Sequence, residues 1–423
     1  MAGLGPAIHD FFLRTQAVDA RLKGGHDGRV ITALTSAIMD SPAPGRPSAS
    51  PGWPVRIAIF YFIFFMVTGV NLPFAPSYFA SRGMGETEIG MLIAAIQLSR
   101  LVGNPLIAHA ADAWGETRLP IIICCTVSLI GFSLFPVIGG FPGLLALSLA
   151  LGLIFTAVMP LSDGLTLRAA ALGNFDYGRV RLWGSIGFIL ASTGAGIFIA
   201  ERGAGLAIWL IIGAWLATVA SSFALPRMAR QRREAGGMLT LLSDKRFLLM
   251  LATCSFIQCS HSLLYAFGTI YWTAAGHSTA TLGWLWAESV VAEVLLFAAA
   301  KRFLPHLPQR YLFVIAGIGA ILRWVLAGIG TALPLLIVVQ FLHAFSFATT
   351  HLAAMTFIAR RIPPGSLASA QVLLSTVVGT SVGLVTIGVG GLYEALGGDG
   401  FYVMAGLALP GLALAILGAR GRD

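Results

Sequence analysis

The sequence predicts an all-α membrane protein in which twelve transmembrane helices form two pseudo-symmetric six-helix bundles. Three observations carry this prediction. Of the 423 residues, 57% are hydrophobic and only 11% are charged, whereas a soluble domain usually has about a quarter charged residues. Apolar runs of the length that spans a bilayer, about 20 residues, recur from Val55 onward. One long basic break divides these runs six and six.

The first 54 residues are polar and end in a stretch rich in proline and glycine. They contain no apolar core of the length that a signal peptide needs, so we expect a disordered cytoplasmic tail. Twelve apolar spans follow, and the 50 glycines suit close helix packing in lipid. The predicted spans are 55–80, 88–111, 119–138, 141–166, 178–200, 204–225, 247–274, 280–300, 310–330, 333–359, 367–392 and 400–419.

Basic residues gather in the connections that this topology puts inside the cell. Of the 27 Lys and Arg residues, only Arg82 and Arg202 fall outside and only Arg100 and Arg323 fall within spans. Cytoplasmic loops collect basic residues, so the net charge of +9 needs no nucleic-acid partner. We expect a monomer in the bacterial inner membrane, with both termini cytoplasmic. Its expected parts are an N-terminal bundle at 55–225, a cytoplasmic linker at 226–246, a C-terminal bundle at 247–419 and a short cytoplasmic C-terminus at 420–423.

The two halves carry a weak internal repeat. An offset of 193 residues aligns identical residues without a gap, each at the junction of the first and second spans of its half. Duplicated halves that rock about a site at mid-membrane are typical of transporters. The matched pairs are Phe74 with Phe267, Tyr78 with Tyr271, Gly83 with Gly276, Gly90 with Gly283, Leu92 with Leu285 and Ala94 with Ala287.

Charged residues within the spans are the first candidates for function, because an isolated charge at the bilayer centre costs about 2.5–3.5 kcal/mol on insertion scales. Arg100 and Glu293 occupy equivalent positions of the repeat. They could pair across the two halves, or each could find a local partner. Asp163 and Arg181 flank one cytoplasmic turn at similar depth. We expect them to form an ion pair, which could bind a ligand or be purely structural.

Titratable side chains in the second half suggest proton coupling. Glu288 and Glu293 lie on different faces of one span, and carboxyl groups in low-dielectric surroundings can gain and lose a proton near neutral pH. Histidines can titrate or donate to an anion, although a histidine on a helix can equally be a packing residue. Those within the spans are His261, His343 and His351. Arg323 is the remaining basic group of this half.

The connection between the second and third spans reads AHAADAWGETR at 108–118. Asp112 ends a helix, Gly115 permits a tight turn, and Arg118 can pair with the acid or with a helix C-terminus. This pattern suits a cytoplasmic latch that forms and breaks, or a simple turn between helices.

Other chemistries find little support in the sequence. The four cysteines lie in apolar segments and form no CxxC pair, so we interpret them as packing residues and expect neither a metal nor a cofactor. There is no HExxH motif, and Ser185 in WGSIG does not match the nucleophile elbow of hydrolases. An intramembrane enzyme is therefore not expected.

From Val55 to Gly418 these features resemble the major facilitator superfamily. Its Gly-x-Leu-Ala-Asp-Arg-x-Gly-Arg-Arg signature is similar to 108–118, where Asp112 and Gly115 match. Residues that depart from the signature are Ala108, Ala113, Glu116 and Thr117. Residues 177–188, YGRVRLWGSIGF, are similar to the phenylpropionate permease group and to its relative lactose permease. Further similar segments are 81–83, 88–90, 343–351 and 391–394.

The resemblance implies roles for several residues. Asp163 and Arg181 fall where lactose permease holds its sugar-binding acid and arginine. Glu288, Arg323 and His343 fall on its span-eight glutamate, its span-nine arginine and its span-ten histidine. The residues that match the phenylpropionate group instead are His261, Glu293 and His351. Lactose permease has an acid where this chain has Ser346, and its span-seven aspartates and span-eleven lysine are absent here.

We therefore expect a secondary transporter that moves a small organic solute, with an aromatic or other organic acid favoured, across the inner membrane by alternating access. The resemblance implies coupling to protons. Alternative hypotheses are an efflux pump for a drug-like compound, a sugar or nucleoside symporter, and a sensor or channel on the same fold.

Overall fold

A computed structural model describes residues 52–228, 238–304, 307–363 and 366–420. This part of the chain is built from helices, with no β-strand element among them. The predicted tail at 1–54 lies almost entirely outside the described residues, as do the centre of the predicted linker and the last three residues. The positions predicted for the apolar spans can be compared with the helices one by one.

The helices follow one another with short connections. Those of the first half are α3 (Trp53–Ser81), α4 (Glu86–Trp114), α5 (Arg118–Leu134), α6 (Phe141–Phe155), α7 (Val158–Gly173), α8 (Tyr177–Arg202) and α9 (Leu206–Ser222). Those of the second half are α10 (Met238–Ser243), α11 (Lys245–Cys259), α12 (Ser262–Ala274), α13 (Thr279–Phe303), α14 (Gln309–Ile329), α15 (Leu333–Phe341), the π-helical turn η1 (Ala344–Ala348), α16 (Thr349–Arg361), α17 (Leu367–Leu396), η3 (Gly397–Asp399) and α18 (Gly400–Arg420).

Every predicted span coincides with one helix or with two or three consecutive helical elements. Among the described residues, nine helical segments are long and apolar enough to cross a membrane. One of them, 369–418, contains both α17 and α18. Two further apolar helices, α5 and α9, are shorter. The apolar character that the sequence predicts is therefore present along the described chain.

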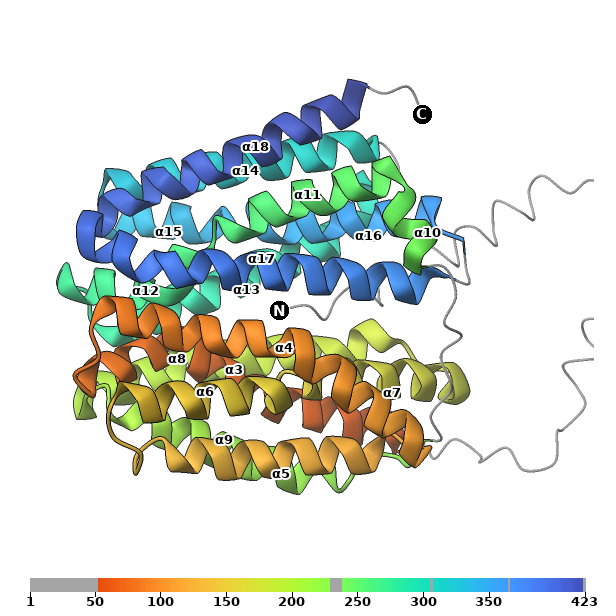
Figure 1. Cartoon of the computed structure of the whole chain (residues 1–423), viewed down its shortest axis with the longest axis horizontal. Coiled ribbons are helices and arrows are strands. Elements are labelled where there is room, and N and C mark those ends of the chain that lie inside the picture. The colour runs from red at the N-terminus through yellow and green to blue at the C-terminus, as the bar shows by residue number, and fades with distance from the viewer. Residues whose placement is uncertain (1–51, 229–237, 305–306, 364–365, 421–423) are drawn as a thin grey trace, which may run out of the picture.

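The helices of the two halves pack mainly within their own half. In Figure 1, α3–α9 lie on one side and α11–α18 on the other. Within the first half, α3 packs on α8 and α9, and α4 packs on α6. Within the second, α18 packs on α11 and α14. Two seams join the halves, one between α4 and α17 and one between α8 and α13.

Glycines bring the halves into backbone contact at the end of the molecule that holds the α3–α4 and α17–α18 turns. We call this the sealed end. A Cβ on Gly90 would lie 3.0 Å from the backbone nitrogen of Gly390, and one on Gly390 would lie 2.5 Å from the carbonyl oxygen of Glu86. On the other seam, a Cβ on Gly196 or Gly283 would collide with the backbone of the partner helix. Only glycine allows so close an approach.

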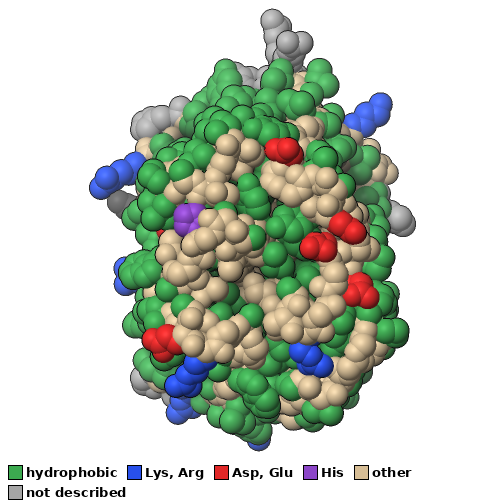
Figure 2. All heavy atoms as spheres, turned by 90° about the vertical axis from the view of Figure 1, so that its left-hand side faces the viewer, with side chains coloured by type: hydrophobic (Ala, Val, Ile, Leu, Met, Phe, Trp, Pro, Cys, Tyr) green, Lys and Arg blue, Asp and Glu red, His purple; other side chains and the backbone are tan. Residues whose placement is uncertain are grey.

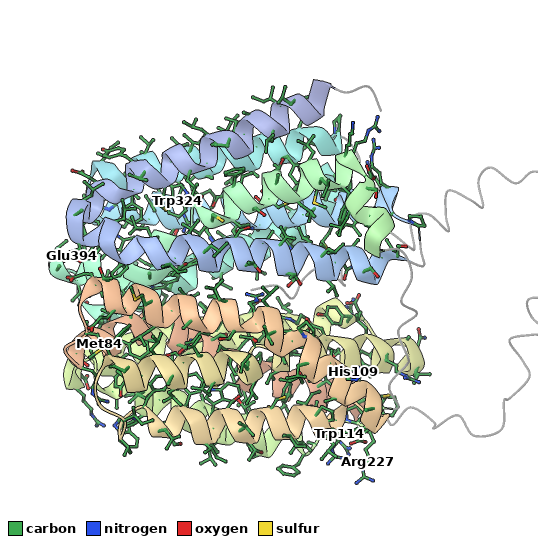
Figure 3. All side chains as sticks on the ribbon, in the orientation of Figure 1. Met84, His109, Trp114, Arg227, Trp324 and Glu394 are labelled. Carbon is green, nitrogen blue, oxygen red and sulfur yellow. The ribbon has the colours of Figure 1, made fainter. Side chains whose placement is uncertain are left out.

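Polar contacts across the seams add to this closure. The Thr279 hydroxyl donates to the carbonyl oxygen of Gly196 at 2.9 Å, and the Thr87 hydroxyl donates to the Glu394 carboxylate at 3.0 Å. Figure 3 shows Met84 and Glu394 together at this end, with His109, Trp114 and Arg227 at the opposite end. Figure 2 looks onto the sealed end, where apolar and uncharged groups dominate and charged side chains are scattered.

Three predicted spans are interrupted within their length. α6 gives way to α7 at 156–157, α11 gives way to α12 at 260–261, and η1 separates α15 from α16. Side-chain hydroxyls compete for backbone carbonyls at these points: Ser260 donates to Ile257 at 2.6 Å and Thr349 donates to Ala344 at 2.9 Å. Such bonds weaken the regular helical ladder, and π-turns often occur at functional sites.

Candidate functional site

Asp163 of α7 forms the first buried polar cluster. Its Oδ1 atom accepts hydrogen bonds from the hydroxyls of Tyr61 at 2.6 Å and Tyr177 at 2.8 Å. The Thr166 hydroxyl donates to that of Tyr61 at 3.1 Å. The structure brings together Asp163 and Arg181, whose Nε lies 3.9 Å from the same Oδ1 atom. At that distance the contact is electrostatic rather than a hydrogen bond.

Arg181 of α8 is held mainly by aromatic rings. Its side chain is 3% exposed, and its guanidinium carbon lies 3.9 Å from the ring centroid of Phe65 and 5.2 Å from that of Tyr61. Its Nε atom is buried and has no hydrogen-bond partner among the described residues. Cation–π contacts stabilise a buried guanidinium without using its N–H groups. Arg181 can therefore still donate hydrogen bonds to a carboxylate.

Arg323 of α14 forms the second cluster and donates hydrogen bonds from all three of its nitrogen atoms. Its Nε donates to the carbonyl oxygen of Val339 at 2.8 Å. Its Nη2 donates to Oε1 of Gln340 at 2.8 Å, and its Nη1 donates to Nδ1 of His343 at 2.9 Å. The acceptors lie on α15 or directly before η1, so the arginine ties α14 to the interrupted span.

His343 connects this arginine with Glu293 of α13. A guanidinium can only donate, so Nδ1 of His343 must accept, and in the neutral ring the proton is then on Nε2. That atom lies 3.6 Å from Oε2 of Glu293. Neither of these two atoms has a hydrogen-bond partner among the described residues. A cation, an imidazole and a carboxyl group thus follow one another in a buried row.

His261 lies at the α11–α12 interruption and joins the same cluster. Its Nε2 is 3.1 Å from the hydroxyl of Ser346, and its Nδ1 is 3.1 Å from the carbonyl oxygen of Ile257. Because a carbonyl only accepts, Nδ1 carries a proton and Nε2 can accept from Ser346. Ser346 also accepts from Nη1 of Arg323 at 3.4 Å. The hydroxyl therefore links the histidine to the arginine.

The remaining residues predicted for binding and coupling interact electrostatically with this row, Glu288 with Arg323 and His351 with Glu293. His351 of α16 is partly buried, and its ring meets that of Phe297 edge-on at 6.5 Å. Glu288 of α13 is partly exposed, whereas Glu293 is buried. The two glutamates therefore have different surroundings, and only Glu293 lies beside a histidine.

Arg100 and Glu293 do not meet in this structure. Arg100 of α4 donates to Oε1 of Gln97 at 3.3 Å, and its guanidinium packs against α17, where a Cβ on Gly379 would lie 2.8 Å from its Cζ. Glu293 lies beside His343 instead. Of the two alternatives open from the sequence, the structure has the local one, because α4 packs on α17 rather than on α13.

The α4–α5 turn uses its glycine and its arginine within the first half. Gly115 has a φ of +68°, the left-handed region that favours glycine. Arg118 donates from Nη2 to the carbonyl oxygen of Phe223, directly after α9. A cation there complements a helix C-terminus. The side chain of Asp112 lies outside the described part of the chain.

Sequence reasoning missed the aromatic partners of the first cluster. Tyr61, Phe65 and Tyr177 surround Asp163 and Arg181, yet aromatic residues are common in membrane helices and gave no signal. Gln340 and Ser346 were likewise not singled out as partners of Arg323. A signal that could have found them is the spacing of polar residues at 340, 343 and 346 along one span.

Comparison with known proteins places the chain in a family. Residues 55–402 match the model of the MFS_1 like family. The chain is 32% identical over 369 residues to a probable 3-phenylpropionic acid transporter of Escherichia coli (strain K12), covering 85% of this chain and 96% of that protein. It is 26% identical over 337 residues to the maltose permease of Geobacillus stearothermophilus, covering 77% and 83%.

The fold has a solved counterpart as well. The crystal structure of the nucleoside transporter NupG superposes with a TM-score of 0.77 at 18% identity, covering 88% of this chain and 100% of that one. The predicted resemblance to the phenylpropionate permease group is confirmed by these matches, as is the prediction of a transporter rather than an enzyme. This chain is a membrane transporter that belongs to the MFS_1 like family of the major facilitator superfamily.

Proposed function

We propose that this protein carries a small aromatic or other organic acid across the inner membrane by alternating access, in symport with protons. The observation that carries the proposal is the buried guanidinium of Arg181, which lies against Phe65 and whose Nε has no hydrogen-bond partner among the described residues. Such a group can take a carboxylate in a charge-assisted hydrogen bond, and the aromatic residues beside it suit an aromatic body. The relative named for 3-phenylpropionic acid supports the same substrate class.

The topology belongs to the same proposal. The eight apolar segments other than 369–418, the two helices within 369–418, and α5 and α9 would together make twelve crossings in two bundles, 55–225 and 247–419. The connections predicted to be cytoplasmic contain most Lys and Arg residues, and Arg227 lies at the end opposite the sealed end (Figure 3), so we assign that end to the cytoplasm. The chain would work as a monomer, and this structure would represent the state closed to the outside.

Proton coupling rests on the row of Arg323, His343 and Glu293. A proton on Glu293 would remove the negative charge that faces His343 at 3.6 Å, and this change would alter the link between α13 and η1. Glu288 would be a second, more accessible proton site. The histidines His261 and His351 would contribute to binding from the same half.

Transport in proteoliposomes tests the function. Labelled 3-phenylpropionate should show counterflow, and it should accumulate when the lumen is made more alkaline than the bath. Arg181→Gln should abolish both, whereas the control Arg179→Gln, an exposed arginine on the same helix, should behave as wild type. If the substrate instead accumulates in the lumen only when protons move out of the vesicle, the protein would be identified as an efflux pump. Flux without counterflow would identify a channel.

The carboxyl groups have their own test. The double variant Glu288→Gln with Glu293→Gln should retain counterflow but lose accumulation driven by the proton gradient. Full gradient-driven accumulation in that variant would exclude both residues from coupling.

The sealed end can be tested through its glycines. Gly283→Leu should force α8 and α13 apart, since even a Cβ there collides with the backbone of α8. A cysteine placed at Thr87 should then react faster with a membrane-impermeant maleimide from outside. The control is Gly388→Leu, where added atoms meet open space. Equal labelling in the two variants would contradict the assignment of this end as an outer gate.

A further inference from the structure

A cavity of about 120 Å³ lies between the two halves and extends into the first half. Its walls come from the second half of α3, from α4, α5, α6 and α9, and from α12 and α17 across the interface. Neither buried arginine lines it, and none of the described residues that do so is charged. The cavity is therefore chemically different from both charged clusters.

The cavity lies nearer the sealed end than the Arg181 cluster. Its α3 residues run from Asn71 to Phe79, whereas Arg181 packs on Phe65 of the same helix. At a rise of 1.5 Å per residue, these lining residues are about 9–21 Å farther along α3. On α4 the lining ends at Gln97, one turn before Arg100. A ligand here would not contact the guanidinium of Arg181.

One wall of the cavity is a cluster of phenylalanine rings. The rings of Phe132 and Phe155 meet edge-on at 5.8 Å, and those of Phe79 and Phe135 meet edge-on at 5.5 Å. All four line the cavity. A further ring can join such a cluster edge-on or offset-stacked. Apolar cavities of about 150 Å³ hold one benzene ring, so the space here suits a single ring.

Other lining residues carry hydrogen-bonding groups. Tyr265 of α12 lines the cavity, and its hydroxyl is buried without a hydrogen-bond partner among the described residues. Buried hydroxyls are rarely left unpaired. Gln97 accepts from Arg100 through Oε1, which leaves its amide N–H groups for another partner, and the amide of Asn71 lies on the same cavity. These groups can bind one polar substituent on the ring.

We propose that this cavity is a second binding site, for an uncharged single-ring aromatic molecule with one hydrogen-bonding substituent, such as a phenol. The site does not depend on the proposed substrate of the Arg181 cluster, because it contains no cation. Such a ligand would contact α3 and α4 of one half and α12 and α17 of the other. Its binding would therefore favour the arrangement in which the sealed end is closed.

The test uses the full chain in nanodiscs with 4-fluorophenol as the probe and fluorobenzene as its partner without the hydroxyl. Binding is followed by the ¹⁹F line width of the probe, with empty nanodiscs as the reference for partitioning into lipid. Ala75 lines the cavity and Ala80 is exposed on the same helix. Ala75→Leu fills the space, and Ala80→Leu is the matched control.

Wild type and Ala80→Leu should bind 4-fluorophenol saturably, and Ala75→Leu should weaken that binding at least tenfold. Tyr265→Phe should weaken the binding of 4-fluorophenol roughly 2- to 10-fold, which is what the loss of one hydrogen bond gives. The same variant should change the binding of fluorobenzene less than twofold. Equal binding by wild type and Ala75→Leu would overturn the proposal, as would an absence of saturable binding. If Ala75→Leu does not fold, the binding of the two probes to Tyr265→Phe decides. Equal weakening of 4-fluorophenol and fluorobenzene binding in that variant would contradict the proposed site.

Discussion

The two buried arginines differ in how completely the fold uses them. Arg323 donates from Nε, Nη1 and Nη2 to groups on or directly after α15. Arg181 is held by aromatic rings, and its Nε has no acceptor among the described residues. Both are almost fully buried, so burial alone does not distinguish them. Their hydrogen bonds suggest that Arg323 maintains a polar network and that Arg181 receives the ligand.

Removal of Arg323 should have the largest effect on stability. Arg323→Gln leaves three buried acceptors without their donor, and each buried acceptor left unsatisfied costs about 1–3 kcal/mol. Arg181→Gln should cost less, about 1–2 kcal/mol, because Asp163 keeps its bonds from Tyr61 and Tyr177. Thermal unfolding of both variants in one detergent measures which of the two loses more stability. Equal losses would remove the distinction between the two clusters.

Loss of the Glu293 charge should uncouple transport. Glu293→Gln keeps a group of the same shape beside His343 but cannot exchange a proton, so gradient-driven accumulation should fall at least tenfold while counterflow persists. Glu288→Gln, on the same helix but partly exposed, should have a smaller effect. Accumulation and counterflow measured on the same vesicles give the comparison. A larger loss in Glu288→Gln would mean that Glu288, and not Glu293, is the principal proton site.

A methyl group at Gly184 should disturb Arg181 without removing it. The new Cβ would lie 2.7 Å from Nη1 of Arg181 and 2.8 Å from Cδ2 of Phe65, so the guanidinium must move. A side chain forced off its rotamer costs about 0.5–1.5 kcal/mol, which corresponds to roughly 2- to 10-fold in carboxylate affinity. Gly194→Ala on the same helix meets open space and should bind as wild type. Unchanged affinity in Gly184→Ala would mean that the position of Arg181 is not critical.

The smallest expected effect comes from Tyr177. Tyr177→Phe removes one of the two hydroxyls that satisfy Asp163, so the carboxylate should attract Arg181 more strongly and compete with the ligand. We expect ligand affinity to fall about two- to threefold, within the net worth of one hydrogen bond. Tyr402→Phe, an exposed tyrosine of α18, is the control. An increase in affinity would contradict this competition.

The sequence predicts the helices well and their interruptions poorly. Hydropathy locates α3, α4 and α8 to within a few residues because each needs a continuous apolar run to face lipid. The interruptions at 156–157, 260–261 and η1 depend on side-chain hydroxyls such as Ser260 and Thr349, which are equally common in unbroken membrane helices. Hydropathy therefore carries no signal for them.

The candidate site is predictable only in part, for a related reason. Asp163 and Arg181 stand out because a charge in a span is costly, and matching depths bring them together. Tyr61 and Phe65 do not stand out, since an aromatic residue in lipid needs no explanation. Arg100 and Glu293 have matching depths as well, yet they lie on different seams. Repeat symmetry fixes the depth of a residue but not which helix it faces.

The most direct test of Arg181 as the ligand-binding cation compares an acid with its amide. Affinities for 3-phenylpropionate and 3-phenylpropanamide are measured for wild type, Arg181→Gln and Arg323→Gln. We predict that wild type prefers the acid by about 100-fold, as two charge-assisted hydrogen bonds would give, that Arg181→Gln abolishes this preference, and that folded Arg323→Gln retains it. Loss of the preference in Arg323→Gln, with retention in Arg181→Gln, would contradict the account.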